Sequence, residues 1–168
     1  MTVADLLHDL FDRVAADVHD AVQGLDLDAL SYRVDATANS IAWLVWHLTR
    51  VQDDHVAEVA GIEQAWTADG WVGRFGLPFP ASATGYGHGG DEVAAVRVDA
   101  DLLLGYFDAV HARTSAYVDG LTEADLDRVV DERWDPPVTL GVRLVSVADD
   151  DIQHAGQAAL VRGVAERR

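Results

Sequence analysis

The chain has 168 residues, of which 29 are acidic and 12 are basic, and all the basic residues are arginine. The net charge of −17 makes nucleic acid and anionic lipid surfaces poor partners, because both repel an acidic protein. Cysteine is absent, which excludes disulfides and thiolate ligands and suits a reducing compartment. No stretch approaches 18 uncharged apolar residues and no signal peptide is recognisable, so we expect a soluble, cytoplasmic protein in which residues 1–168 form one domain.

The first helix is predicted over residues 2–23, because apolar side chains recur there at spacings of three, four and seven residues. Thr2 is a suitable N-cap for this helix, and Gly24 ends the apolar pattern. The following residues 25–38 are predicted to form a connector to the second helix.

A second helix is predicted from Asn39 or Ser40, either of which can cap it, to about Ala60, where Gly61 is the stop signal. The first half of this helix is apolar on nearly every side, and such a helix must be buried on most of its faces. We therefore expect His47 to occupy an interior position.

Residues 62–98 break the helical pattern, because they combine many glycines and two prolines with several aromatic residues. Disordered segments lack aromatic residues, so we expect an ordered loop that packs over one end of the bundle and supplies a wall for a substrate. The alternative is a surface insertion whose aromatic residues are incidental. A histidine in such a loop, His88, is usually just solvated. The aromatic residues are Trp66, Trp71, Phe75, Phe79 and Tyr86.

The second half of the chain contains two further long helices, predicted over residues 100–119 and 140–165. A short helix at residues 122–128 and a rigid turn at residues 134–137 lie between them. No strand-like alternation persists, so we predict an all-α fold, an antiparallel four-helix bundle with the long aromatic and glycine-rich loop between its second and third helices. The residues that open the two long helices are Asp99 and Thr139.

The last helix carries a run of three aspartates followed by a histidine. At about 100° per residue, His154 points with the apolar side chains toward the core. Asp150 lies about 40° to one side of His154 and Asp151 about 60° to the other, whereas Asp149 points toward solvent. Because His47 faces the interior from the second helix, two imidazoles and at least one carboxylate are predicted to project into the same space.

A buried carboxylate is costly unless it is paired, strongly hydrogen-bonded or bound to a metal. His47, Asp150 and His154 fill three positions of a metal site, and a further position left for water or substrate is the catalytic pattern. Other interpretations of the same residues stay open. The Asp-x3-His spacing also arises by chance, His47 is equally explained as a core histidine bonded to a carbonyl, and Asp151 is an alternative carboxylate ligand.

Two segments, Asn39-Ser-Ile-Ala-Trp-Leu-Val-Trp-His-Leu and Asp150-Asp-Ile-Gln-His-Ala-Gly-Gln, resemble the DinB-like superfamily, most closely its mycothiol S-transferase branch. The resemblance covers nearly the whole chain, including residues 131–139. It implies that a divalent metal is bound by His47, Asp150 and His154. An acidic residue at the position of Asp150 also occurs in a mycothiol-dependent isomerase relative. This mixed set of ligands leaves the metal open, with zinc as the first choice and nickel, iron or manganese as alternatives.

Further polar residues are candidates for catalytic and binding roles. Asp54 lies two turns along the His47 face of the second helix, as a proton acceptor or as the partner of a ligand. Gln157, one turn beyond the last predicted ligand, is a candidate for contact with a bound molecule. Arg50 or Arg143 is a candidate for holding an anionic cofactor or substrate, unless each merely neutralises its acidic neighbours. His55 lies off this face, and we expect it at the rim.

These residues favour an enzyme that uses the metal to activate an external thiol, because the chain has no cysteine and a metal-bound thiol loses its proton near neutral pH. The resemblance implies mycothiol as the thiol and a small electrophile as its acceptor, and together with the apolar helices it favours a homodimer. One alternative is a metal-dependent hydrolase, in which hydroxide replaces the thiolate. The other is a stress protein that binds a metal or ligand without turnover.

Overall fold

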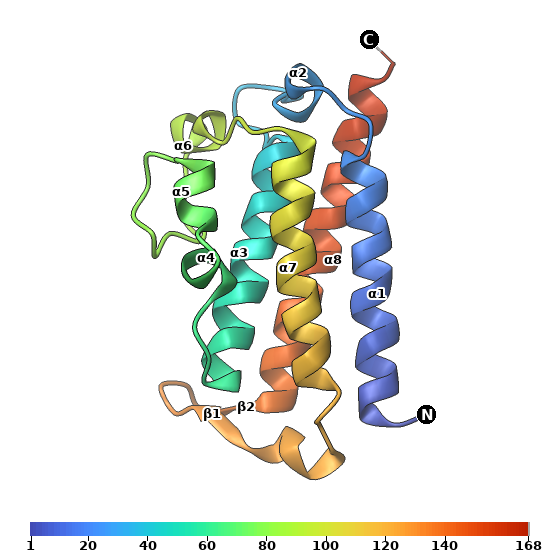
Figure 1. The fold of residues 1–168 in the computed structure, drawn as a ribbon, viewed down its shortest axis with the longest axis vertical. Helices are drawn as coiled ribbons and strands as arrows, with labels where there is room; N and C mark the ends of the chain where they lie inside the picture. The colour runs from blue at the N-terminus through green and yellow to red at the C-terminus, as the bar shows by residue number, and fades with distance from the viewer. Residues whose placement is uncertain (168) are drawn as a thin grey trace.

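The computed structural model describes residues 1–167, so the last residue of the predicted domain, Arg168, lies outside the described residues. Four long helices form the body of the molecule (Figure 1): α1 (Val3–Val22), α3 (Ile41–Ala60), α7 (Ala100–Val118) and α8 (Leu140–Ala165). The predicted all-α four-helix bundle is therefore confirmed. The connections contain α2 (Leu27–Leu30), α4 (Ala65–Ala68), α5 (Trp71–Phe75), α6 (Gly90–Ala95), the 3-10 helix η1 (Glu123–Asp127), and the strands β1 (Val129–Asp131) and β2 (Val138–Thr139).

The four long helices begin directly after residues that cap them, as the sequence predicts. The side-chain oxygen of each cap accepts a hydrogen bond from the backbone N–H three residues later, which satisfies a donor that has no partner inside the helix. The helix α3 ends at Gly61, whose φ of 68° lies in the left-handed region that favours glycine. The caps are Thr2, Ser40, Asp99 and Thr139.

The long helices do not alternate strictly in direction, because α1 and α8 run one way and α3 and α7 run the other (Figure 1). Gln52 donates to the hydroxyl of Thr114, and Tyr117 donates to the carbonyl of Val59, so residue numbers rise together along α3 and α7. The neighbouring pairs α3/α8 and α1/α7 are antiparallel. A chain that leaves the far end of α3 must return to the starting end before α7 begins, which is the physical reason for the long connection.

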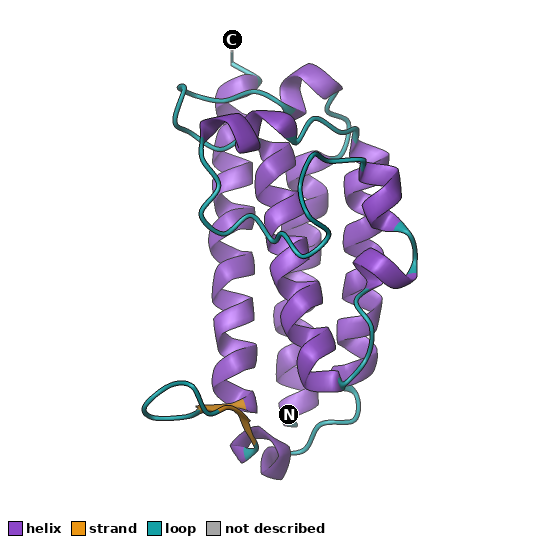
Figure 2. Cartoon of the chain, turned by 90° about the vertical axis from the view of Figure 1, so that its left-hand side faces the viewer, coloured by secondary structure: helices purple, strands orange, loops and turns teal. Residues whose placement is uncertain are grey.

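The connection at residues 62–98 is ordered, as predicted. The prediction that it packs over one end of the bundle was wrong, because it covers the flank of α3 and α7 (Figure 2). The ring centroids of Trp66 and Phe75 lie 5.1 and 5.7 Å from that of Tyr106 in α7. These rings are buried and belong to the core. Most aromatic residues of the loop therefore stabilise the fold, and Tyr86 is the one that lines the pocket described below.

A short antiparallel hairpin precedes α8, with Val129 of β1 opposite Thr139 of β2. The sequence gives no sign of these strands, because strands of 3 and 2 residues are too short to show an alternating pattern, and the fold remains all-α. The predicted turn at residues 134–137 joins the two strands, and the predicted helix at 122–128 is the 3-10 helix η1. Among residues 1–167, no helix has the combination of length and apolar character that a bilayer crossing requires.

Candidate metal centre

Three side chains converge between α3 and α8. His47 from α3, and Asp150 and His154 from α8, each offer one potential ligand atom, and these atoms all lie within 4.8 Å of one another. The two imidazole rings meet edge to face, with their centroids 4.7 Å apart. The antiparallel packing of α3 on α8 therefore brings the predicted ligands together.

His47 is buried, and its ring is oriented by a stacked neighbour and by one hydrogen bond. The ring stacks on Trp43 with a centroid distance of 4.7 Å, and Nδ1 bonds to the backbone carbonyl oxygen of Thr84 in the long loop. Because a carbonyl oxygen only accepts, Nδ1 carries the proton and Nε2 keeps the lone pair that a metal requires. Burial also lowers the pKa of His47, so the ring is neutral at neutral pH.

Gly85 allows the loop backbone to approach His47 this closely. An added Cβ at this position would lie 2.7 Å from Nδ1 of His47 and 3.1 Å from the rings of Trp43 and Trp46. The φ angle of Gly85 is +100°, a conformation that L side chains rarely adopt. Glycine at this position therefore lets the carbonyl of the preceding residue, Thr84, reach the imidazole.

His154 is oriented by its own helix. Its Nδ1 donates to the backbone carbonyl of Asp150 at 2.8 Å, and the same nitrogen lies 3.3 Å from Oδ2 of the Asp150 carboxylate. Because Nδ1 carries one proton, we assign the hydrogen bond to the shorter contact and treat the carboxylate contact as electrostatic. Burial lowers the pKa of His154, but the hydrogen bonding and charge of Asp150 outweigh it and raise this pKa above its ordinary value.

Asp150 supplies the negative charge of the triad. Its Oδ2 is buried and accepts no hydrogen bond from any of residues 1–167. A buried carboxylate oxygen without a partner is costly, and a divalent cation would remove this cost. Two imidazole nitrogens and one carboxylate oxygen are also ligand types that zinc and related divalent metals accept. The residues present therefore fit a divalent metal ion.

The two aspartates that flank Asp150 have different surroundings. Asp151 is fully buried, and burial raises its pKa well above the ordinary value, so this side chain is a neutral acid and a poor ligand. Asp149 is exposed, as predicted, and accepts a hydrogen bond from Gln153 at 2.8 Å. Of the two carboxylates left open by the sequence, the geometry favours Asp150 over Asp151.

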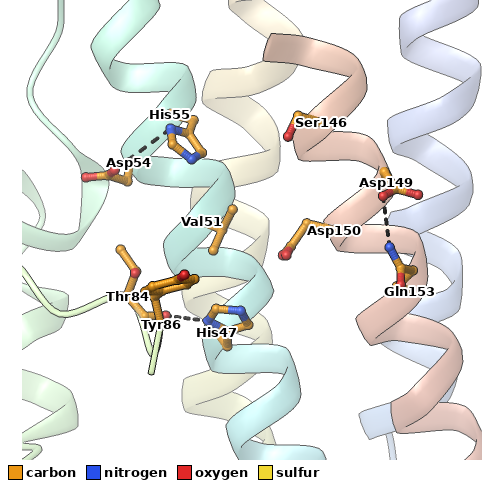
Figure 3. Close-up of a pocket in the computed structure, with 10 residues that line it drawn as sticks. All are labelled: His47, Val51, Asp54, His55, Thr84, Tyr86, Ser146, Asp149, Asp150 and Gln153. Atoms are coloured by element: carbon orange, nitrogen blue, oxygen red, sulfur yellow. Dashed lines mark hydrogen bonds and ion pairs between the residues drawn. The ribbon is translucent and has the colours of Figure 1, made fainter. Parts of the chain in front are cut away.

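A pocket of about 360 Å³ opens beside the triad (Figure 3), within the size range of small-molecule sites. The long loop contributes Thr84 and Tyr86 to its wall, and Tyr86 is 95% exposed. The helices α3 and α8 contribute two members of the triad and a group of other side chains. This group consists of Val51, Asp54, His55, Ser146, Asp149 and Gln153.

Asp54 lines this pocket, two turns of α3 away from His47. Its Oδ1 accepts a hydrogen bond of 2.6 Å from Nε2 of Gln64, which fixes the carboxylate. Seven residues of helix correspond to roughly 10 Å along the axis. Asp54 therefore reaches a group held at the triad only through a substrate atom or through water.

The position of Arg50 contradicts the expected role in cofactor binding. The side chain is fully buried, and its guanidinium donates to the carbonyl of Ala83 at 3.1 Å and to Gln64 at 2.9 Å. The same guanidinium lies 3.7 Å from the carboxylate of Asp53 and over the ring of Trp66. A dissolved ion cannot reach it, so Arg50 fastens the long loop to α3.

Arg143 and Gln157 also lie in surroundings other than those expected. Arg143 is nearly buried and directs its two terminal nitrogens at His55, Glu58 and Asp131, so it is not free to hold an anion. Gln157 lies on the exposed face of α8 and is not among the residues that line the pocket beside the triad. The glutamine that does line this pocket is Gln153, one turn earlier.

Two further histidines lie in surroundings other than those expected. His55 was expected at the rim, but it lines the pocket directly. His88 was expected to be solvated, but its Nδ1 accepts a hydrogen bond from the indole of Trp43 at 3.2 Å. The glycine-rich stretch around Gly85 is the one signal in the sequence that could have indicated a close backbone approach, but it does not show which residue is approached.

The fold and the triad define the class of this protein, a DinB-like helical bundle with a candidate metal site between α3 and α8. The sequence profile described as Mycothiol-S-transferase matches residues 6–166, so the chain belongs to this DinB-like family. It is also similar to a crystal structure of a conserved protein from Enterococcus faecalis, with 30% identity and a TM-score of 0.93. That similarity covers 100% of this chain and 99% of the other. No curated protein matches the chain.

Proposed function

We propose that this protein is a metal-dependent thiol S-transferase that activates mycothiol for attack on a small electrophile. Membership of the Mycothiol-S-transferase family supports the choice of thiol and of reaction. The observation that carries the proposal is the convergence of His47, Asp150 and His154 beside an open pocket. Zinc is the proposed metal, while a cytoplasmic location and a homodimer stay predictions.

The chemistry depends on how the chain prepares its ligands. A divalent ion at this site would lower the pKa of a coordinated thiol and so supply a thiolate near neutral pH. The backbone carbonyls of Thr84 and Asp150 hold a proton on Nδ1 of each imidazole, so Nε2 is the nitrogen that would bind a metal. The carboxylate of Asp150 adds a negative charge that favours a cation over a second proton. Because the chain has no cysteine, the sulfur must come from a separate molecule.

The pocket supplies the other requirements of thiol transfer. Its wall combines the exposed ring of Tyr86 with polar groups on α3 and α8, so an electrophile has both apolar and hydrogen-bonding surface available. Asp54 is the proposed acceptor of the proton that the thiol loses, and its distance along α3 requires a water molecule in between. Gln153 takes the place of Gln157 as the proposed glutamine contact to the substrate.

Elemental analysis and a thiol-consumption assay test this proposal. We expect about one divalent ion per chain in the wild-type protein and in a His8→Ala control, since His8 lies on α1 outside the triad. His154→Ala should lose the ion. Consumption of mycothiol with a panel of electrophiles should require both the triad and the absence of chelator. Full retention of metal by His154→Ala, or turnover that is indifferent to chelator, would refute the proposal.

The same open triad also suits a metal-dependent hydrolase, because an unfilled ligand position serves water as well as a thiol. The two enzymes differ in their need for thiol. Turnover of ester or amide substrates without added thiol would identify the hydrolase. Metal binding without any turnover would identify a protein that only binds a metal or ligand.

A further inference from the structure

His55 is the second histidine that α3 contributes to the pocket beside the triad. It lies eight residues after His47, which corresponds to roughly 12 Å along the helix axis. Its Nδ1 lies 2.6 Å from Nη1 of Arg143 on α8. The pocket therefore has a histidine at each end, and only the one at the triad end is a potential metal ligand.

The contact with Arg143 fixes the protonation of His55. A guanidinium has only N–H donors and keeps its charge in proteins, so Nδ1 of His55 must accept the hydrogen bond. The ring is then the neutral tautomer with its proton on Nε2. Burial, followed by the charge of Arg143, lowers the pKa of His55, which keeps the ring neutral at neutral pH. The nearby carboxylates of Asp54, Glu58 and Asp150 act in the opposite direction, but they do not outweigh these two effects.

Arg143 is itself held in place from two sides. Nη1 also donates to Glu58 at 3.2 Å, and Nη2 donates to Asp131 of β1 at 3.2 Å. Asp131 is bound in turn by Arg133, whose hydrogen bonds lower the pKa of this carboxyl, so it remains charged. The side chain of Arg143 is only 10% exposed. This network leaves the tautomer of His55 little freedom to change.

The Nε2–H group of His55 has no acceptor within residues 1–167. Figure 3 shows this nitrogen on the lower side of the ring, the side on which Val51 and Asp150 lie, and all three residues line the same pocket. Nδ1 of the same ring lies 4.0 Å from Asp54, which is too long for a hydrogen bond. A neutral N–H donor with a fixed direction therefore faces the space where a substrate would lie.

We propose that His55 is a catalytic hydrogen-bond donor to a substrate oxygen that gains negative charge, so that the preferred electrophiles of this site are epoxides. The inference rests on the proposed thiol-transferase function. In such a reaction the sulfur–carbon bond forms as the carbon–oxygen bond breaks, and the electron pair of the broken bond stays on oxygen. The Nε2–H of His55 stabilises this oxygen. The proton that the thiol loses passes through a water molecule to Asp54. Water returns a proton to the oxygen, and Asp54 gives its proton back to the solvent.

A matched pair of electrophiles separates this role from a purely structural one. Both 1,2-epoxybutane and 1-iodobutane react at a primary carbon, but only the epoxide places the departing electron pair on oxygen. With zinc-loaded protein and mycothiol, His55→Leu should lower kcat for the epoxide about 10²–10³-fold. The ratio of the epoxide rate to the iodide rate should fall by about 10²-fold or more. His55→Gln, which keeps an N–H donor, should restore most of this ratio, and a His8→Leu control should not change it.

The tautomer of His55 is measured independently of turnover. Nitrogen chemical shifts of ¹⁵N-histidine-labelled apo protein should show Nε2 protonated and Nδ1 unprotonated at neutral pH, and Arg143→Met should give a mixture of tautomers. A proton on Nδ1 in the wild type would overturn the proposal. An equal loss of both reactions in His55→Leu, or a loss of neither, would also overturn it. If the wild type consumes neither electrophile, the proposed function itself fails, and this inference fails with it.

Discussion

The variant Gly85→Ala tests whether the long loop orients the proposed ligand His47. The added Cβ would lie 2.7 Å from Nδ1 of His47 and 3.1 Å from two tryptophan rings, which is closer than ordinary van der Waals contact. These neighbours are rings packed in the core, so the loop backbone has to move away. Overpacking of this kind costs about 1–3 kcal/mol, and a left-handed backbone at a residue with a Cβ adds about 1–2 kcal/mol.

We therefore expect Gly85→Ala to lower the free energy of unfolding by about 2–5 kcal/mol, measured by urea denaturation of the apo protein. Movement of the loop also withdraws the carbonyl of Thr84 from His47, so that the proton is no longer fixed on Nδ1. Loss of a partner that orients a metal-binding histidine weakens metal affinity about 10–100-fold. Competition with a chromophoric chelator measures this change.

Gly87→Ala is the matched control for this experiment. Gly87 also has a positive φ of 77°, but an added Cβ there would meet nothing within 4 Å. The control should therefore lose about 1–2 kcal/mol of stability from backbone strain and keep its metal affinity. Equal metal affinity of Gly85→Ala and Gly87→Ala would refute the reasoning that the loop orients His47.

Three further predictions concern the charges around the site. Metal affinity should fall about tenfold per pH unit below the raised pKa of His154, because proton and metal compete for Nε2; a flat titration between pH 5 and 8 would contradict this. In the apo protein, the same raised pKa adds stability below the unfolded pKa of about 6.5, and this contribution is lost as the pH rises through the folded pKa. Asp150→Asn should lower the pKa of His154, measured by NMR titration, and remove that dependence. Arg50→Met should lower the free energy of unfolding, measured by urea denaturation, by about 3–5 kcal/mol, because it leaves the buried carboxylate of Asp53 without its cation. A decrease below about 1 kcal/mol would show that the loop does not need this arginine.

The helix boundaries and the relative positions of Asp150 and His154 could be predicted from the sequence because both follow from local geometry. A cap such as Ser40 acts on a backbone N–H only three residues away, so its role is visible in a short window of sequence. The positions of Asp150 and His154 follow from the helical period, which fixes one residue relative to the other. His47 could not be joined to this pair by local geometry alone, because its place in the triad depends on the packing of α3 on α8, and the complete set of ligands was implied by the family resemblance.

The features that the sequence did not reveal depend on contacts between distant segments. The bond from His47 to Thr84 depends on the path of a loop that has no repeating pattern. The pairing of His55 with Arg143 joins residues 88 positions apart, and each of them alone resembles an ordinary surface residue. Arg50 was assigned to a ligand because an arginine near a predicted site suggests anion binding, whereas burial shows that it binds the loop.

Because the ligands come from both α3 and α8, the supply of metal would affect how long the protein survives in the cell. In the sequence, α3 precedes the long connection and α8 follows it. An ion held by both helices would therefore link the first and last thirds of the polypeptide. Binding to the folded chain alone adds about 2.7 kcal/mol of stability when free metal is at 100 times its Kd. Under metal starvation, freshly made chains would open more often and be cleared sooner by proteases, so the amount of this protein would follow the availability of the ion.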